Sequence, residues 1–431
     1  MNITKELWNK RLIILALIIS TLPFAYLLFD NKVLPDFWYR LGNVSGFIGG
    51  VLILWQFILG IKEVSRRITS DYGWSLKLHI FLGVNGAFFV FLHPILEAIS
   101  YGKNLLWIFQ FDYSDNFATG ISIGRQALFL FLLIWISSSL ARNLLSYRVW
   151  LYIHYLSYPM LFFALVHPFQ IGSIILTYNW VYNYWVFIGI LFLSFVAIRL
   201  IEVLNIKSNR YKLLEKKEFP GGTFTYKFSP LDKKLTCIPG QYFFIKKNLF
   251  GEAHPFSVLD YDPVSGDLTF GVKVFGKFTK KMSEMVEGTE VVISGPFGTF
   301  THEGHNADPK VILAGGIGVT PFYPLVKKYG NEKTFMINAN QKLEFALYRD
   351  EFKKLLGYRY FDCIANEEIS EKNVYFGVVT CDLLQKNLPK DIYTTGRFFI
   401  CGPAGFMKAM INNLLTLGVK TSQIYTEEFG Y

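Results

Sequence analysis

The stretch HIFLGVNGAFFVFLH, residues 79–93, begins and ends with histidine inside an apolar segment, and HYLSYPMLFFALVH, residues 154–167, repeats that design. Ionisable side chains are costly within lipid and usually mark a functional site there. On an ideal helix His79 and His93 lie roughly 21 Å apart along the axis and about 40° apart around it. Neutral imidazole is a good axial ligand of haem iron, so two such helices side by side could hold two stacked haems.

Six apolar segments fill the first half of the chain. Hydrophobic residues make up 52% of the 431 residues, and about 20 apolar residues in helical form cross a bilayer. The predicted spans are 11–29, 43–61, 78–100, 121–140, 149–170 and 181–204. The first follows a basic start without a small-residue cleavage site, so we expect a true span rather than a signal peptide. Residues 1–204 are therefore predicted to form an all-α six-helix transmembrane bundle in a lipid bilayer.

The net charge of +10 is sorted by loop and forms no continuous basic stripe, so we expect no nucleic-acid partner. One set of loops carries nine basic residues: Lys5, Lys10, Arg11, Lys62, Arg66, Arg67, Lys77, Arg142 and Arg148. The opposite set carries Lys32, Arg40 and Lys103. The positive-inside rule then predicts a multi-pass protein of the cell membrane whose N-terminus and polar second half are cytoplasmic. Arg125 does not follow this rule and is expected to face protein or a haem propionate.

This orientation assigns the histidines to two depths, His79 with His154 for an inner haem and His93 with His167 for an outer one. An ideal helix would leave His154 and His167 about 140° apart, and Pro159 between them predicts a corrective kink. Gly83 and Gly86 are expected to leave room for the flat porphyrins.

The alternative is that these histidines merely bond between membrane helices. Two matched pairs with a compatible direction favour haem, and because no Cys-x-x-Cys-His attachment motif occurs, the haems would be noncovalent and b-type. The cysteines, Cys237, Cys363, Cys381 and Cys401, all lie in the polar half, where we expect them to stay reduced.

The polar half predicts two modules. Residues 205–305 carry short alternating stretches such as TFTYKFS and LTFGVKV between turn residues, which predicts an antiparallel β-barrel. Residues 306–431 alternate buried-strand runs, KVILA, TFMINA and RFFICG, with helical patterns, which predicts an α/β domain with a parallel sheet.

The run GGIGVTPF, residues 315–322, follows the first of these buried strands. Its glycines permit tight turns and let backbone N–H groups reach a pyrophosphate, at the positive end of the helix that follows. Proline stands where the usual dinucleotide motif ends in glycine, so the motif alone is weak. The predicted nucleotide contacts are Gly315, Gly316, Gly318, Val319, Thr320 and Pro321.

A family resemblance strengthens this interpretation. The motifs that carry it are HPFSVLD at 254–260, GVKVFGKFT at 271–279, GPFG at 295–298, GGIGVTPF, CGP at 401–403 and EEF at 427–429. In this order they resemble ferredoxin-NADP reductase-like flavoproteins, and the six-helix half resembles the ferric reductase-like membrane domain. Nearly the whole chain is similar to prokaryotic NADPH oxidases of the ferric reductase/NADPH oxidase transmembrane superfamily.

The resemblance implies a set of flavin and nicotinamide contacts. These are Tyr242, His254, Pro255, Phe256, Ser257, Lys273, Gly276, Thr279, Cys401, Gly402, Pro403 and Phe429. Within this set, Lys273, Gly276 and Thr279 would lie near the FAD pyrophosphate. Cys401 would lie at the hydride-transfer point, and Phe429, or Tyr431 in its place, would stack on the flavin. His302 and His305, in a polar loop, are expected to be solvated.

Several positions depart from the family pattern. Asn340 stands where NADPH-using relatives carry an arginine; Lys342 could compensate, so the choice between NADPH and NADH stays open. Gly49 and Glu97 replace an arginine and a histidine that are linked to oxygen chemistry in the eukaryotic oxidases, and Met160 stands between the expected haems. Only about ten residues precede the first span, so constitutive activity is expected rather than calcium switching.

The resemblance implies that NAD(P)H reduces FAD and that two haems carry the electrons to molecular oxygen, which becomes superoxide. A ferric or cupric metalloreductase with the same electron route is the alternative. More remote is a haem-free membrane anchor whose flavin domain serves a protein partner. No obligatory protein subunit is expected.

Overall fold

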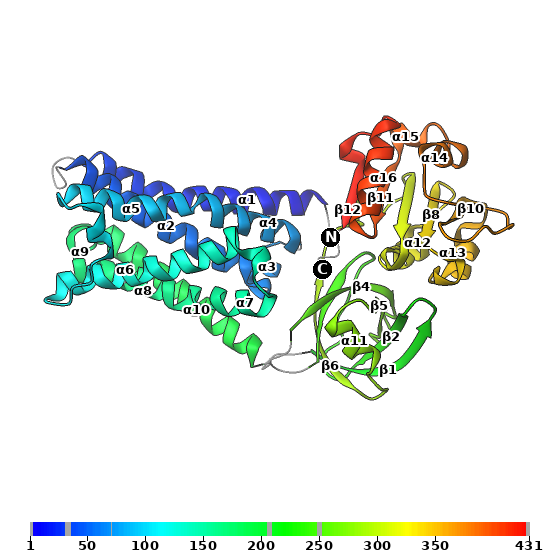
Figure 1. Cartoon of the computed structure of the whole chain (residues 1–431), viewed down its shortest axis with the longest axis horizontal. Helices are drawn as coiled ribbons and strands as arrows, with labels where there is room; N and C mark the ends of the chain where they lie inside the picture. Colours follow the sequence, from blue (N-terminus) through cyan, green and yellow to red (C-terminus); the bar gives the residue numbers. More distant parts are fainter. Residues whose placement is uncertain (1–2, 31–35, 70, 205–208, 248–251, 428–431) are drawn as a thin grey trace. The chain divides into compact units, whose positions relative to one another are not determined.

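The computed structural model describes residues 3–30, 36–69, 71–204, 209–247 and 252–427. Two compact units emerge, Met1–Glu202 and Val203–Tyr431 (Figure 1).

The first unit is all helical. Its helices are α1 Ile3–Thr21, α2 Phe37–Gly60, α3 Lys62–Ile68, α4 Tyr72–Asn85, α5 Ala87–Ser100, α6 Asn116–Trp135, α7 Tyr147–Tyr155, α8 Ser157–Ile171, α9 Ser173–Thr177 and α10 Asn179–Val203. Shorter helical turns are η1 Leu22–Leu28, η2 Leu105–Phe109, η3 Ile136–Leu140 and η4 Arg142–Leu144.

Six helical segments among the described residues are long and apolar enough to cross a membrane. They are Leu7–Leu28, Phe37–Gly60, Tyr72–Ser100, Asn116–Leu140, Tyr147–Ile171 and Asn179–Ile201. The predicted six-helix bundle is confirmed, although each span begins a few residues before its predicted start. For four of the spans the cause is capping: the side chains of Asp36, Asp71, Asp115 and Ser146 accept backbone N–H groups ahead of the apolar runs.

Helix α2 is the centre of this bundle. In the most apolar 18-residue stretch of α2, 61% of the residues are buried, against 17–33% in the corresponding stretches of the other five spans. Large apolar side chains of the outer helices are exposed instead, among them Ile19, Phe88 and Leu193. Such outward apolar faces are expected of helices whose surroundings are lipid.

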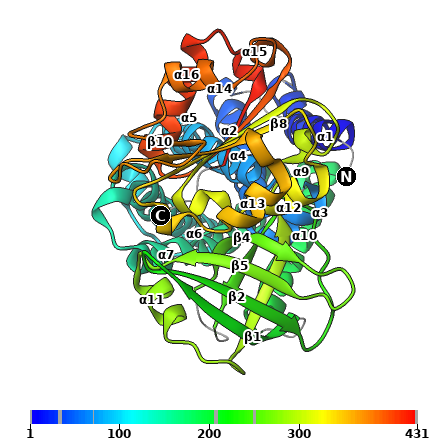
Figure 2. The same ribbon diagram turned by 90° about the vertical axis from the view of Figure 1, so that its right-hand side faces the viewer.

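The second unit begins with a closed antiparallel barrel in the order β1-β2-β5-β4-β3-β6. Its elements are β1 Asn209–Phe219, β2 Thr223–Pro230, β3 Tyr242–Lys246, β4 His254–Tyr261, β5 Leu268–Lys273, β6 Glu290–Phe297 and the helix α11 Lys277–Ser283. In Figure 2 strands β1, β2, β5 and β4 lie side by side. The predicted β-barrel is confirmed.

A six-stranded sheet with parallel pairing follows, in the order β10-β9-β8-β7-β11-β12. The strands are β7 Lys310–Gly315, β8 Thr334–Asn340, β9 Tyr360–Ile364, β10 Val374–Phe376, β11 Arg397–Cys401 and β12 Ile424–Glu427. The helices are α12 Phe322–Tyr329, α13 Arg349–Leu356, α14 Cys381–Asn387, α15 Ile392–Thr395 and α16 Ala404–Thr416. Helical turns are η5 His302–Gly304, η6 Gly316–Val319, η7 Leu343–Phe345, η8 Gly357–Arg359 and η9 Thr421–Gln423. The predicted α/β domain is confirmed.

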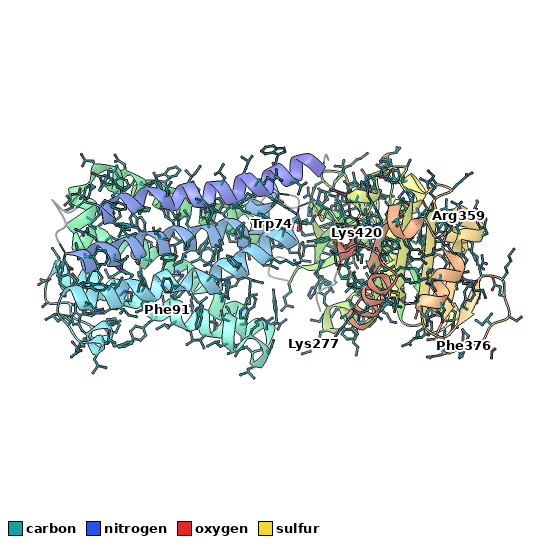
Figure 3. The ribbon with its side chains drawn as sticks, turned by 90° about the horizontal axis from the view of Figure 1, so that it is seen from above. Trp74, Phe91, Lys277, Arg359, Phe376 and Lys420 are labelled. Carbon is teal, nitrogen blue, oxygen red and sulfur yellow. The ribbon has the colours of Figure 1, made fainter. Side chains whose placement is uncertain are left out.

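The six sheet strands differ in burial. Strand β7 is buried along its whole length, whereas Phe376 on the edge strand β10 is 62% exposed and lies at the margin of the unit (Figure 3). A fully buried central strand in a parallel sheet explains the unbroken apolar run VILA that follows Lys310.

Candidate cofactor sites

The helical bundle brings the four membrane histidines together in two pairs. The ring centres of His79 and His154 are 6.0 Å apart, and those of His93 and His167 are 6.3 Å apart. An imidazole nitrogen binds a metal at roughly 2 Å and its ring centre lies about 1 Å farther on, so rings on opposite sides of one iron have centres about 6 Å apart. Both separations therefore fit a metal centre between the rings.

Backbone carbonyls of α2 orient one histidine of each pair. His79 Nδ1 lies 3.0 Å from the Gln56 carbonyl oxygen, and His93 Nδ1 lies 2.9 Å from that of Gly42. Because a carbonyl only accepts, each Nδ1 carries the proton and each Nε2 keeps its lone pair. Histidines that bind metals are commonly oriented by such a hydrogen bond from the other ring nitrogen.

Three glycines make room for the histidine rings. A Cβ atom would lie 2.9 Å from His93 at Gly46, 3.2 Å from His79 at Gly60, and 3.0 Å from His167 at Gly124. Real Cβ contacts are rarely this short, so α2 and α6 can approach the rings only with glycine there. The sequence interpretation missed these residues, although the spacing GNVSGFIGG in residues 42–50 offered a signal.

Gly83 and Gly86 lie where α4 and α5 approach α2. A Cβ at Gly83 would lie 3.3 Å from Gln56 Oε1, and one at Gly86 would lie 3.3 Å from a Leu52 methyl carbon. Both glycines thus face α2, and the expectation that they leave room for porphyrins stays a prediction.

The kink expected between His154 and His167 occurs three residues before Pro159. Helix α7 ends at Tyr155 and α8 begins at Ser157, so the break is at Leu156. The proline ring clashes with the carbonyl four residues earlier, which belongs to Tyr155. The break turns His154 and His167 toward the same neighbouring helix pair, where α4 and α5 meet at Gly86.

A cavity lined by residues of α2, α5, α6 and α8 adjoins the outer histidine pair. Apolar residues such as Phe131, Met160 and Trp185 form much of its lining. The polar part of the lining includes Tyr39, Asn43, His93, Glu97, Tyr101, Arg125 and His167.

Arg125 brings a positive charge to this cavity. It is only 6% exposed, its Nη1 donates to the Gln110 carbonyl oxygen, and its guanidinium carbon lies 4.6 Å from the Trp107 ring centre. Its buried Nη2 has no hydrogen-bond partner among the described residues. A buried donor without a partner is costly, and a ligand carboxylate would satisfy it.

Glu97 brings a carboxyl group to the same cavity. Its Oε1 accepts a hydrogen bond of 2.9 Å from Asn43 Nδ2 and lies 3.8 Å from His93 Nδ1. The cavity therefore combines a guanidinium and a carboxyl group beside the outer histidine pair.

The second unit offers a nucleotide site where its strand order reverses. Strands β8, β9 and β10 follow β7 outward on one side of it. Strands β11 and β12 then follow on the other side. Ligands of open α/β sheets bind at the carboxyl ends of the strands at such a switch point. Gly315 ends β7 and Cys401 ends β11, so both predicted glycine turns begin there.

The two turns pack backbone against backbone. A Cβ at Gly318 would lie 2.3 Å from the Cys401 carbonyl oxygen, and one at Gly402 would lie 3.0 Å from Gly315 Cα. Gly316 has φ +55°, and a Cβ at this position would meet no atom within 4 Å, so its backbone faces open space. The structure thus brings the predicted glycines together and leaves room at one of them.

Other residues of this motif would present main-chain groups, and not side chains, to a nucleotide. Val319 and Thr320 are buried, and Thr320 Oγ1 donates to the Ile317 carbonyl oxygen at 3.1 Å. Pro321 precedes α12. A nucleotide would therefore meet main-chain N–H groups here.

The predicted flavin residues of the barrel gather on β3 and β4. Tyr242 pairs with Ser257, and Phe244 pairs with Pro255. The buried Ser257 hydroxyl has no hydrogen-bond partner among the described residues, which leaves it available to a ligand. Burial lowers the pKa of His254, whose ring stacks on Phe278 with centres 3.9 Å apart; Phe256 also stacks on Phe278.

The predicted pyrophosphate residues lie at the end of β5 and the start of α11. Lys273 is the last residue of β5, and Gly276 caps α11. Thr279 Oγ1 accepts the backbone N–H groups of Phe275 and Gly276 at 2.9 and 3.0 Å. Its oxygen is therefore occupied by the helix start, so we expect Thr279 to shape this turn.

The end of β12 reaches the barrel near Tyr242. A Cβ at Gly298 would lie 3.0 Å from the Tyr242 ring and 3.5 Å from Glu427 Oε1. Phe429 and Tyr431, predicted to stack on the flavin, lie outside the described residues.

Cys401 is fully buried, and Gly402 and Pro403 continue from it toward α16. Burial and the neighbouring Glu427 raise the pKa of this thiol well above its usual range. The sulfur therefore stays a neutral thiol, and no nucleophilic role follows from its position.

The expectation of solvated histidines in the 302–305 loop was wrong. His302 is buried, and the His305 ring stacks on Tyr329 with centres 4.8 Å apart. His305 Nε2 lies 3.0 Å from Thr301 Oγ1, and burial lowers the His305 pKa to about 4. The polar composition of the loop gave no sign of the contact between His305 and Tyr329, which lies on α12.

Three family models match the chain in succession. They are "Ferric reductase like transmembrane component" over residues 45–165, "Oxidoreductase FAD-binding domain" over 211–302 and "Oxidoreductase NAD-binding domain" over 312–411.

Curated relatives match only part of the chain. A flavohemoprotein of Bacillus cereus is 27% identical over 46% of this chain and 54% of its own length. NADH-cytochrome b5 reductase 1 of Aspergillus terreus is 28% identical over 50% of this chain and 80% of its own. The chain spans about half the length of the first relatives it matches. Among solved structures, the FAD/NAD-binding domain of a Vibrio cholerae nitric oxide dioxygenase is 22% identical, with a TM-score of 0.46 over 52% of this chain and 99% of that one.

Proposed function

From the premise that this chain joins a ferric reductase-like transmembrane domain to FAD- and NAD-binding oxidoreductase domains, as ferric reductase/NADPH oxidase-like proteins do, we propose that it reduces oxygen to superoxide across the cell membrane. NAD(P)H and FAD supply the electrons, and two b-type haems supply the relay through the bilayer. Both the N-terminus and the flavoprotein half are cytoplasmic in this proposal. Its domains are 1–204, 205–305 and 306–431.

The observation that carries the proposal is the pairing of the membrane histidines. Four imidazoles in two pairs, with ring centres 6.0 and 6.3 Å apart, suit two bis-histidine metal centres. His79 and His154 hold the inner haem, and His93 and His167 hold the outer one. The carbonyls of α2 keep two of these rings in the tautomer that binds iron.

The unpaired Arg125 nitrogen adds support from the cavity. A haem carries carboxylate groups, and a buried guanidinium is the side chain best suited to hold one. We assign Arg125 to an outer-haem propionate.

In the second unit, the main-chain groups of Gly315–Pro321 and of Gly402 and Pro403 bind the nicotinamide nucleotide. Tyr242 and His254–Ser257 hold the flavin. Lys273 and the turn at Gly276, shaped by Thr279, complement its pyrophosphate. Cys401 packs beneath the hydride-transfer point as a small neutral group, and Phe429 or Tyr431 covers the flavin ring.

A ferric or cupric reductase is the second candidate, and Glu97 is the observation that favours it. Its carboxyl group lines the outer cavity, and carboxyl oxygens are suitable ligands for a metal cation. Oxygen remains the first choice because the lining is largely apolar and a small neutral acceptor needs no charged site.

The two candidates separate in one assay. Purified full-length protein is given NADH or NADPH. Superoxide-dismutase-sensitive dye reduction is measured in air, and ferric-chelate reduction is measured separately under nitrogen. We expect the dye rate to exceed the chelate rate. A chelate rate far above the oxygen rate would establish the metalloreductase instead.

A membrane-anchored flavin reductase for a protein partner is the remote alternative. It predicts a colourless membrane half with full NAD(P)H-dependent dye reduction by the flavin domain. Haem absorbance in the purified chain excludes it.

A further inference from the structure

The carboxyl end of β8 holds features that bear on which nicotinamide nucleotide is used, a question that rests on the proposed function. Strand β8 neighbours β7, the strand that leads into the glycine turn, and Asn340 is its last residue. In dinucleotide folds of this kind, the group that follows the second strand meets the adenosine ribose. NADH presents a 2′-hydroxyl there, whereas NADPH presents a 2′-phosphate.

Asn340 carries an unused donor at this place. It is 8% exposed, and its Nδ2 has no hydrogen-bond partner among the described residues. Its backbone oxygen accepts from Ala365 N at 2.9 Å, so the strand end is held in place. A buried N–H group without a partner is costly, and a hydroxyl oxygen of a bound ribose would satisfy it.

Lys342 is the one cation in the described sequence 340–345, which begins at this strand end. Two carboxylates already lie close to it. Its Nζ lies 3.7 Å from Glu344 Oε1 and 4.0 Å from Glu367 Oε1. Glu367 Oε2 also accepts the Leu343 N–H at 3.1 Å, which fixes that carboxylate. Lys342, Glu344 and Glu367 together carry a net charge of about −1.

A second lysine approaches the same corner from the barrel. Lys273 Nζ lies 6.0 Å from the Phe345 ring centre, and Lys342 Nζ lies 5.9 Å from it. We assign Lys273 to the flavin pyrophosphate, so its charge is committed to another phosphate group.

We infer that this chain selects NADH over NADPH, with Asn340, Glu344 and Glu367 as the residues that set the preference. A 2′-phosphate carries a charge of about −1.5 to −2 at neutral pH and would meet both carboxylates. A 2′-hydroxyl is neutral; it can donate to a carboxylate and accept from the Asn340 amide.

The test is anaerobic flavin reduction of the full-length protein, followed by absorbance after rapid mixing with NADH or NADPH. We expect the second-order rate constant for NADH to exceed that for NADPH by about tenfold or more. Inhibition of the wild-type protein by 5′-ADP should likewise be stronger than inhibition by 2′,5′-ADP. Equal rates, or faster reduction by NADPH, would overturn the inference.

The double variant Glu344→Gln, Glu367→Gln removes both charges and keeps an acceptor for the Leu343 N–H. We expect the preference for NADH to fall severalfold because NADPH gains affinity once the two negative charges are removed. The matched control is Glu332→Gln, in the loop before the amino end of β8, which should leave the ratio unchanged. An unchanged ratio in the double variant would show that these carboxylates do not set the preference.

Failure of the proposed function has a different signature. If neither nucleotide reduces the flavin, the electron route itself is wrong. If both reduce it and NADPH is faster, only the present inference fails.

Discussion

At the scale of single residues, the histidines carry the account. His154→Ala removes one ring of the inner pair and should leave about one haem per chain instead of two, because a single imidazole holds the iron weakly. Haem is counted by its absorbance in alkaline pyridine against protein concentration. The matched control is Tyr152→Phe, an exposed residue on the same helix α7, which should retain both haems.

Two haems retained in His154→Ala, with unchanged low-spin spectra, would show that His154 is not a ligand. Loss of all haem would show that the two centres form together.

A buried lysine gives a second prediction at this scale. Lys310 is 1% exposed, and its Nζ donates to the carbonyl oxygens of Asn306 and Tyr329 at 2.8 and 3.1 Å. Burial lowers its pKa to about 8 in the folded protein, from 10.5. Between pH 8 and 10.5 the unfolded chain therefore binds more protons than the folded chain, so the free energy of unfolding rises with pH across this window. Below pH 8 the buried charge lowers that free energy by a constant amount.

Lys310→Met should remove that dependence. The stability difference between wild type and variant should change by at most about 1.4 kcal/mol per pH unit across this window. Denaturant unfolding of both proteins at several pH values, followed by flavin fluorescence, measures it. Parallel curves for the two proteins would contradict the assignment.

At the scale of elements, glycine on α2 and α6 decides how closely these helices approach the histidines. Gly46→Val would place carbon within 2.9 Å of the His93 ring and should displace it, with loss of the outer haem. The matched control is Gly189→Val on α10, where a Cβ meets no atom within 4 Å. Haem content and redox titration of the remaining haem are the measurements.

Retention of both haems in Gly46→Val would show that α2 can move away from His93 without loss of the outer haem, which would contradict this prediction. Loss in both variants would indicate general misfolding instead.

The sequence predicted elements well where one local rule governs them. Apolar runs predicted six spans, and alternating stretches between turns predicted the barrel. The start of each span was less predictable because caps such as Asp36 and Asp115 lie outside the apolar run. The break at Leu156 followed from Pro159, whereas the facing of Gly83, Gly86 and the His305 ring depended on helices distant in sequence.

The candidate site divides in the same way. Residues on one continuous motif, such as Gly315 to Pro321, could be named from the sequence because strand, turn and helix follow in order. The groups that orient the histidines could not, since Gln56 and Gly42 act through backbone carbonyls that any residue type carries. Arg125 was noticed as an exception to the charge rule, but its contact with Trp107 required the fold.

At the scale of the whole molecule, charge sorting predicts which surfaces face the cytoplasm. Lys103 lies in a loop assigned to the outer side, and Lys277 begins α11 in the flavoprotein half (Figure 3). In intact cells, a membrane-impermeant maleimide should label Lys103→Cys but not Lys277→Cys, which should react only after permeabilisation. The wild type, with its own four cysteines, is the control. The opposite pattern would reverse the proposed orientation.

The most direct test of the central claim is an absorbance spectrum of the purified full-length protein, recorded oxidised and then under nitrogen with NADH. We predict a Soret band of low-spin bis-imidazole haem, about two haems per chain, and a shift to the reduced spectrum that reverses when oxygen is admitted. A protein that shows no Soret band even after reconstitution with haemin would contradict the account.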